Sequence, residues 1–327
     1  MILANTIAPP AAACAGSMGA GGAIVAPDRA AAAQRAAQLI TPAQLAETLA
    51  SSEPVIVIEL ASPLELEVDP RRIPGSSRVW RPEYQQETGL DGIVPTAAAF
   101  TALARRLGID AHSQIVLVDR KYDATRLWWL FQLFGKTDGV RLLDGGWQAW
   151  LAEGLPITVS APLSPPPAGT WTALDPEPRL LATREAVLAL AVAPDRQLWD
   201  VRTVEEHTGA KTMQNAARPG RIPWTTERVE WGLFRRPDGS WCSAEEVGAL
   251  AEAALGGTSV GDGTTHTFYC QSGVRTTQLI FGLALAGWPL ERLRNYDGSW
   301  VEWSHLADDA AVVVGTPQKV ACQDTSE

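Results

Sequence analysis

The stretch 142-LLDGGWQAW-150 recurs later in the chain as 295-NYDGSWVEW-303, with its aspartate, first glycine and both tryptophans in the same register. Two further pairs of segments keep the same order: 71-RRIPGSSRVW-80 with 220-GRIPWTTERVEW-231, and 115-IVLVDR-120 with 266-HTFYCQ-271. The offsets within the three pairs are nearly equal, at 153, 149 and 151 residues. Ordered similarity at one offset predicts two copies of a single domain.

The bulk composition is that of an acidic globular protein. Hydrophobic residues make up 46% and charged residues 20% of the 327 positions, enough to fill two ordinary domain cores. A net charge of -10 and a pI near 5.0 argue against a nucleic-acid partner, because binding phosphates requires a basic surface. The sequence has no apolar run of roughly 18 residues, so we also expect no membrane partner.

A proline-rich segment separates the two copies. Residues 156–178 contain seven prolines, which predicts a semi-rigid linker without ladder hydrogen bonds. The predicted domain organisation has five parts: a disordered extension (1–38), a first domain (39–155), the linker (156–178), a second domain (179–306) and a tail (307–327).

The first 38 residues are rich in alanine and glycine and lack a basic start. This pattern favours a disordered extension over a secretory signal, and therefore a cytoplasmic protein. A periplasmic or secreted location would follow if the segment were a signal.

Strand and helix patterns alternate within each copy. Short apolar runs predict strands at 55–60, 115–119, 141–143, 197–201 and 265–269. Longer periodic segments predict helices at 96–107, 126–134, 147–153 and 274–286, and capping signals place further helix starts at Thr41, Thr183 and Ser243. This alternation predicts α/β domains, each with a mainly parallel sheet flanked by helices. Functional sites in such sheets lie beyond the carboxyl ends of the strands.

Cys270 stands where a predicted strand ends and the next helix is about to begin. Four residues separate it from Arg275: Gln271, Ser272, Gly273 and Val274. Their backbone N–H groups, together with the helix N-terminus, can form a cradle for an anion. Such a cradle and the charge of Arg275 would stabilise a thiolate. The alternative is a buried structural cysteine, but the loop that follows favours a reactive thiol.

The chain has four cysteines: Cys14, Cys242, Cys270 and Cys322. They are too few and too scattered for a disulfide framework, and their spacing does not match a zinc site. We therefore expect no metal and no organic cofactor.

Taken together, these segments resemble the tandem-domain rhodanese family of sulfurtransferases over about residues 39–306. The resemblance rests on six segments: DVRTVEEHTG (200–209), GRIP (220–223), CQSGVR (270–275), YDGSWVEW (296–303), RIPGS (72–76) and LLDGGWQAW (142–150). It implies two rhodanese-like domains, of which the second carries the active cysteine. Asp119 stands at the corresponding position of the first copy, which should be structural and should line one wall of the site.

The resemblance also implies roles for individual residues. Cys270 would be the catalytic nucleophile, and residues 271–275 would bind the substrate. Asp200, Arg202 and Arg221 would support the cysteine loop. The loop has the form Cys-x4-Arg, which is similar to the family's sulfur-transfer loop and shorter than the Cys-x5-Arg loop of related phosphatases.

The sequence departs from the family pattern near the donor site. The family places an arginine four residues after the Asp-x-Arg arginine to anchor the sulfur donor, and this chain has Glu206 there. Trp224 likewise follows GRIP where the family usually has glycine. We therefore expect Glu206 to repel an anionic donor, Arg275 to take over its anchoring, and Glu206→Arg to strengthen the use of thiosulfate.

The function implied is sulfur transfer by covalent catalysis. The Cys270 thiolate would take a sulfane sulfur from a small anionic donor, thiosulfate, and pass it to cyanide or to a small or protein thiol. Three alternatives stay open: 3-mercaptopyruvate as the donor at the same cysteine, a weakly active sulfur-carrier or binding protein, and a phosphatase or arsenate reductase, which the loop length disfavours. We expect a monomer.

Two further sets of residues carry expectations about packing. Trp147 and Trp150 lie in the copy without chemistry, so we expect them and their counterparts Trp300 and Trp303 to be core residues. For Arg126 the sequence leaves two positions open, the interdomain site and an exposed helix surface.

Overall fold

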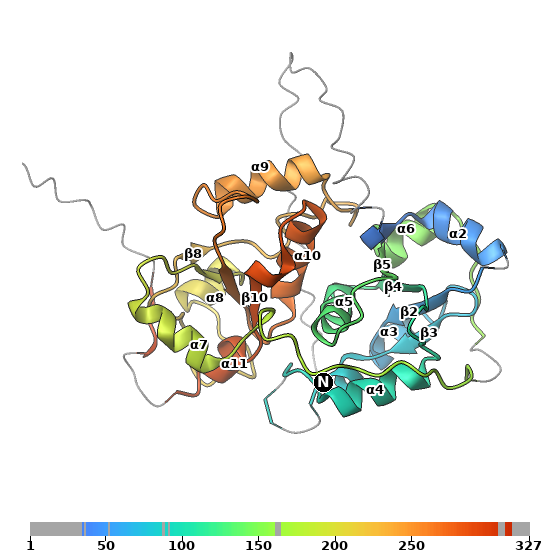
Figure 1. Cartoon of the computed structure of the whole chain (residues 1–327), viewed down its shortest axis with the longest axis horizontal. Helices are drawn as coiled ribbons and strands as arrows, with labels where there is room; N and C mark the ends of the chain where they lie inside the picture. Colours follow the sequence, from blue (N-terminus) through green and yellow to red (C-terminus); the bar gives the residue numbers. More distant parts are fainter. Residues whose placement is uncertain are drawn as a thin grey trace, which may run out of the picture.

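The computed structural model describes residues 35, 37–51, 53–86, 89–90, 92–160, 165–306 and 311–315. These residues form two α/β lobes, the first in blue and green and the second in yellow to red in Figure 1. The predicted extension before residue 35 and the tail beyond residue 315 lie outside the described residues.

The first domain alternates short strands and helices along the chain. Its elements are β1 (Leu39–Ile40), α2 (Pro42–Ala50), β2 (Ile56–Leu60), α3 (Pro63–Val68), β3 (Ser77–Val79), the 3₁₀ helix η1 (Arg81–Tyr84), α4 (Ala97–Arg106), β4 (Ile115–Asp119), α5 (Ala124–Leu133), β5 (Val140–Leu143) and α6 (Gly146–Ala152).

The second domain repeats this plan. Its elements are β6 (Leu181–Ala182), α7 (Arg184–Ala189), η2 (Leu190–Val192), β7 (Leu198–Asp200), α8 (Val204–Thr208), β8 (Glu227–Arg228), α9 (Ala244–Ala254), β9 (His266–Tyr269), α10 (Arg275–Leu285), η3 (Leu290–Arg292), β10 (Leu293–Tyr296) and α11 (Ser299–Trp303).

Both sheets are five-stranded and parallel throughout. Their strand orders are β1-β5-β4-β2-β3 and β6-β10-β9-β7-β8, which is one order written twice. The predicted α/β fold and the internal repeat are therefore confirmed.

The capping signals read from the sequence begin helices where they were expected. The Thr41 hydroxyl accepts the N–H of Gln44, and the Gln44 side chain accepts the N–H of Thr41, so α2 starts with a complete capping box. Ser243 and Glu246 do the same for α9. The sequence analysis missed α3, because this six-residue helix has no buried face from which a period could be read.

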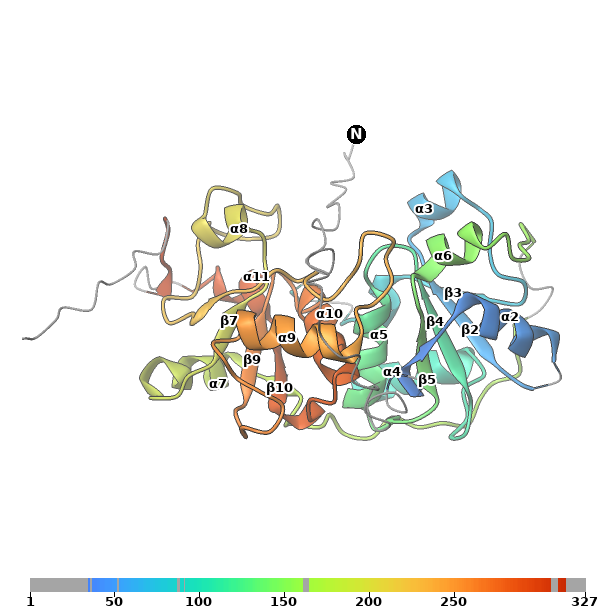
Figure 2. The ribbon, with the colours of Figure 1, turned by 90° about the horizontal axis from the view of Figure 1, so that it is seen from above.

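The two domains share one continuous core. Helices α5 and α10 pack against each other there and lie side by side in Figure 2. Trp128 of α5 meets Phe281 of α10 edge to face, with ring centroids 4.8 Å apart. On the outer faces, Trp147 and Trp150 are buried in the first domain and Trp300 and Trp303 in the second, as packing residues.

The described parts of the proline-rich linker, residues 156–160 and 165–178, are bound to the first domain. The N–H groups of Gly169 and Trp171 donate to the carbonyls of Arg105 and Ile109, at 2.8 and 3.0 Å. A β-carbon at Gly169 would lie 2.2 Å from the Ile109 carbonyl, so the close approach requires glycine. The expectation of a linker without backbone pairing was wrong here, because its prolines leave other N–H groups free to donate.

Two predicted boundaries also shift. Arg35, assigned to the extension, donates to Asp144 of the first domain and to the Trp241 and Cys242 carbonyls of the second. Residues 311–315, assigned to the tail, pair with the second domain through backbone bonds between Arg221 and Val313. Among the described helices, none has the length and apolar character needed to cross a membrane.

Candidate active site

Cys270 directly follows β9, and α10 begins five residues after it. Its side chain is buried, with the residue 1% exposed. Within the described part of the chain it is the only free cysteine, since Cys242 is disulfide-bonded. The strand-to-helix junction predicted for Cys270 is therefore where the structure places it.

The hydroxyl of Ser299 ties the cysteine loop to the next strand-to-helix junction. It accepts the N–H of Cys270 at 3.1 Å and the N–H of Gly273 at 3.0 Å, and it donates to the Tyr296 carbonyl at 2.7 Å. One donor and two acceptors use the full capacity of a hydroxyl. Ser299 thus fixes both the first residue of the loop and its glycine.

Ser299 holds this position in a backbone conformation that side chains rarely adopt. Its φ is +48°, the only positive value of a non-glycine residue in the described chain. Gly146 is its counterpart in the first domain, with a φ of +60°. The sequence analysis did not single out Ser299. Comparing LLDGGW with NYDGSW would have marked it, because serine replaces Gly146 at a position with positive φ.

Substituting Ser299 separates the strain from the hydrogen bonds. Ser299→Gly relieves a backbone cost of roughly 1 kcal/mol, but it leaves the buried N–H groups of Cys270 and Gly273 without an acceptor at roughly 1–3 kcal/mol each, so its free energy of unfolding should fall by about 1–5 kcal/mol. Ser299→Ala keeps the strain and should be the less stable of the two. Both variants should lose about tenfold or more in turnover, measured beside denaturant unfolding. Full turnover in Ser299→Gly would contradict this role of the hydroxyl.

The Gly273 carbonyl is held on the side of the loop that faces the first domain. It accepts from Nδ2 of Asn295 at 2.9 Å and from Nη1 of Arg126 at 3.1 Å, and the Thr276 hydroxyl lies 2.9 Å away. Gly273 has a φ of +67°, and a β-carbon there would lie 2.8 Å from the Asp297 carbonyl. The loop therefore requires glycine at this position.

The first copy shows what such a loop binds. Asp119 replaces the cysteine, and its Oδ1 accepts the N–H groups of Lys121 at 3.2 Å and Asp123 at 3.0 Å. Burial raises the pKa of Asp119 to about 6, against the lowering effect of Arg235, so the side chain is mostly an anion at neutral pH. In this fold, an anionic side chain at the first loop position is bound by the loop's own amides.

The equivalent amides of the second copy belong to Ser272 and Val274. Neither N–H donates to an acceptor within the described residues. Cys270 occupies the same first loop position as Asp119. The arrangement can therefore stabilise negative charge on a thiolate, or on a sulfur atom attached to it.

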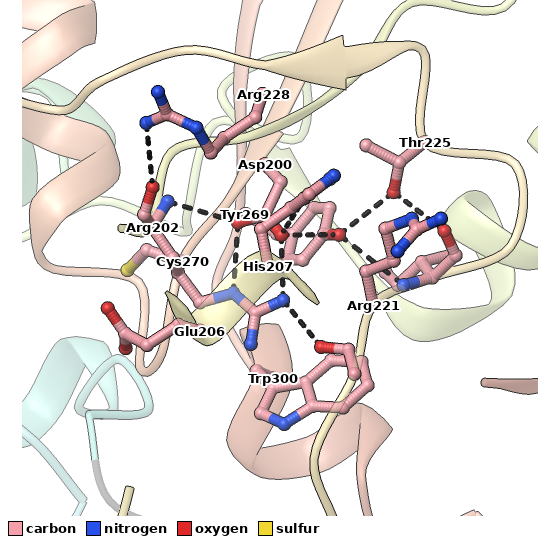
Figure 3. Close-up of polar contacts among 12 residues, drawn as sticks. Asp200, Arg202, Glu206, His207, Arg221, Thr225, Arg228, Tyr269, Cys270 and Trp300 are labelled. Atoms are coloured by element: carbon pink, nitrogen blue, oxygen red, sulfur yellow. Dashed lines mark hydrogen bonds and ion pairs between the residues drawn. The ribbon is translucent and has the colours of Figure 1, made fainter. Parts of the chain in front are cut away.

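A buried polar cluster lies beneath the cysteine loop (Figure 3). Asp200 accepts from Arg202 through both carboxylate oxygens, at 2.9 and 2.7 Å, and also bonds His207 and Tyr269. Burial opposes the ionised form, but Arg202 and His207 hold the pKa of Asp200 well below its usual range. The cluster joins the ends of β7 and β9, because Tyr269 immediately precedes Cys270.

Arg202 is fixed on its other faces as well. Its guanidinium lies over the rings of Trp300 and Tyr269, at 4.6 and 5.4 Å from their centroids, and donates to the Gly220 carbonyl at 2.8 Å. Asp200 and Arg202 thus contact Tyr269, the residue before Cys270, and His207 is a partner that the sequence did not reveal.

Arg275 and Glu206 form a buried ion pair, which corrects the expected anchoring scheme. Nη1 and Nη2 of Arg275 each lie 2.7 Å from an oxygen of Glu206, and the two side chains are 4% and 1% exposed. Burial alone would raise the pKa of Glu206, but the bonds from Arg275 lower it below its usual value. Glu206 therefore neutralises Arg275 instead of repelling a donor from a free arginine.

The other charges close to this pair are also balanced. Arg228 donates to Glu230 at 2.8 Å and to the Arg202 carbonyl at 3.2 Å. Burial raises the pKa of Glu230; Arg228 and Arg275 oppose this rise, and Glu206 adds to it. Arg202, Arg228 and Arg275 therefore each face a carboxylate.

Two other predicted residues have different contacts from those expected. Arg221 donates to the Gly315 carbonyl at 2.6 Å, so it holds the C-terminal segment and does not contact the cysteine loop. Gln271 donates to Asn215 at 2.7 Å, and its Oε1 is buried without a partner in the described chain. Among the described residues, no cluster of His, Cys, Asp and Glu side chains is arranged to hold a metal ion.

Comparison with known proteins agrees with this fold. The rhodanese-like domain family matches residues 41–153. The sulfur carrier protein TtuD of Thermus thermophilus is 34% identical over 251 residues, which is 73% of this chain and 84% of the relative. The 3-mercaptopyruvate sulfurtransferase of Rattus norvegicus is 31% identical over 253 residues, 76% of this chain and 82% of the relative.

A solved structure shows the same tandem arrangement. The crystal structure of the Tum1 protein from Saccharomyces cerevisiae matches with a TM-score of 0.72 and 21% identity, over 86% of this chain and 99% of that one. The chain belongs to the rhodanese family of sulfurtransferases.

Proposed function

We propose that this sulfurtransferase works through a persulfide on Cys270, with thiosulfate as its donor. The thiolate attacks the outer sulfur of thiosulfate, the S–S bond breaks, and sulfite leaves with the bonding electron pair. Cyanide or a thiolate then attacks the terminal sulfur of the persulfide, which restores the Cys270 thiolate. The two half-reactions give ping-pong kinetics.

The observation that carries the proposal is the carboxylate of Asp119 in its own loop. It accepts two backbone N–H groups at 3.0 and 3.2 Å, and their counterparts in the second copy have no acceptor within the described chain. A persulfide on Cys270 would bring a terminal negative charge to these free donors. Both walls of the site come from the two domains of one chain, so we also propose that a monomer is active.

The balanced charges around Cys270 support two further candidates. Because Arg275 is paired with Glu206, a small dianion meets no unpaired guanidinium from Arg202, Arg228 or Arg275. The singly charged 3-mercaptopyruvate, or a persulfide carried by a protein, depends less on such a group. Weak turnover with every small donor would indicate a sulfur carrier, the name given to the Thermus thermophilus relative.

Sulfur loading distinguishes these candidates. We expect thiosulfate to add one sulfur atom to the intact mass and cyanide to remove it. The same loading should be measured with 3-mercaptopyruvate, and kcat/KM should be compared for both donors over a range of ionic strengths. If neither donor loads the protein while a protein persulfide does, the donor assignment is wrong and the carrier candidate stands.

A further inference from the structure

Arg126 reaches across the domain boundary to the cysteine loop. It lies on α5 of the first domain and is 1% exposed. Nη1 donates to the Gly273 carbonyl at 3.1 Å, and Nη2 lies 2.6 Å from both the Gly92 carbonyl and Asp297. One guanidinium therefore joins a loop of the first domain, the cysteine loop and the junction that carries Ser299.

Helices α5 and α10, which follow the equivalent loops of the two copies, pack against each other. The hydroxyls of Thr125 on α5 and Thr277 on α10 lie 2.9 Å apart. One residue further along each helix, Arg126 bonds the Gly273 carbonyl while Gln278 bonds the Tyr122 carbonyl at 2.8 Å. Each domain thus holds the other's loop at the equivalent carbonyl.

The two contacts differ in the charge of the donor. The loop without a cysteine is held by a neutral amide from Gln278, whereas the loop with Cys270 is held by the charged guanidinium of Arg126. A charge-assisted bond is roughly twice as strong as a neutral one. Gly92 of the first domain packs directly against the cysteine loop, since a β-carbon there would lie 2.3 Å from the Ser272 carbonyl.

The orientation of one peptide unit links Arg126 to the sulfur. The described peptide bonds are all trans, so the Gly273 carbonyl and the Val274 N–H point in opposite directions. Holding the carbonyl toward Arg126 turns the N–H away from it. The equivalent N–H in the first copy, that of Asp123, points at the Asp119 carboxylate.

We propose that Arg126 is a positioning residue through which the non-catalytic domain orients the Val274 N–H toward the Cys270 persulfide. The first domain is then part of the catalytic unit although it supplies no reacting group. This inference rests on the proposed persulfide function. Arg126 acts through the peptide unit and has no contact with the donor, so its effect should appear in kcat and in the lifetime of the persulfide rather than in KM.

The test compares Arg126→Met and Arg126→Lys with the matched control Arg120→Met. Arg120 is also a buried arginine of the first domain, bonded to Glu59 at 2.7 Å and lying over Trp147, but it does not contact the cysteine loop. Arg126→Met removes the charged partner of Asp297, and Arg120→Met leaves Glu59 with Arg78 at 3.9 Å, so both Met variants should lose stability. Activity is therefore measured at a temperature where all variants are folded.

Arg126→Met should lower kcat by about 10- to 100-fold, with KM changed less than about threefold, and should shorten the half-life of the loaded persulfide in intact-mass measurements. Arg126→Lys retains one charged donor and should recover part of the loss, while folded Arg120→Met should turn over like wild type. Equal activity in the Arg126→Met and Arg120→Met variants, or a change confined to KM, would overturn the inference. If wild type itself forms no persulfide on Cys270, the proposed function fails instead.

Discussion

Cys270→Ser is expected to abolish sulfur transfer while leaving the fold unchanged. Serine has nearly the volume of cysteine and can keep the backbone bonds of residue 270 to Ser299 and Trp300. Serine has no sulfur atom on which a persulfide can form, so turnover should fall by more than about 10³-fold. Thiosulfate should then add no sulfur to the intact mass, while thermal unfolding should resemble that of wild type.

The control for this experiment is the location of the added sulfur in wild type. Peptide mapping should find it on Cys270, which is the free cysteine of the described chain, whereas Cys242 is disulfide-bonded. A cyanide-labile sulfur on Cys14 or Cys322, or loading that survives in Cys270→Ser, would show that the site has been assigned to the wrong residue.

The sequence was sufficient to predict the architecture because its signals there are local or repetitive. Two copies follow from three segment pairs at one offset, and the start of α2 follows from Thr41 and Gln44, which are adjacent on the helix. The position of Cys270 follows from the change between a strand pattern and a helix pattern. None of these predictions required knowledge of which distant residues meet.

The contacts that complete the site do require that knowledge. Ser299 acts on residues 29 and 26 positions away, and Glu206 meets Arg275 across 69 positions. Arg126 meets Gly273 across 147 positions and only after the two domains have docked. Comparing the copies residue by residue would have marked Ser299 against Gly146, but the pairing of Glu206 with Arg275 has no such local signal.

The pairing of Glu206 with Arg275 reverses the effect expected for Glu206→Arg. As an isolated departure from the family pattern it predicted repulsion of the donor, and Glu206→Arg was expected to help. In the folded protein that substitution would bring two guanidinium groups together in a site that is nearly closed to water. We now expect Glu206→Arg to destabilise the protein and not to improve the use of thiosulfate.

The coupling between Arg275 and Glu206 can be measured with single and double variants. Arg275→Gln leaves the Glu206 carboxylate buried without its partner, and Glu206→Gln leaves the guanidinium buried, so each should lower the free energy of unfolding at pH 7 by about 3–5 kcal/mol. The double variant carries two neutral amides that can bond each other, and it should recover most of this loss. The coupling free energy is measured by denaturant unfolding of all four proteins.

The dependence on pH gives the same pair a second test. In wild type, Arg275 holds the pKa of Glu206 below its usual value of 4.5, so the stabilisation is present above that value and is lost as the pH falls through the folded-state pKa. In Arg275→Gln, burial without a partner should raise that pKa, so protonation removes the unpaired charge as the pH falls. The stability difference between wild type and Arg275→Gln should therefore narrow from pH 7 to pH 4. A difference that stays constant, together with additive single variants, would mean that the two side chains do not depend on each other, and Arg275 would again be a candidate for binding the donor.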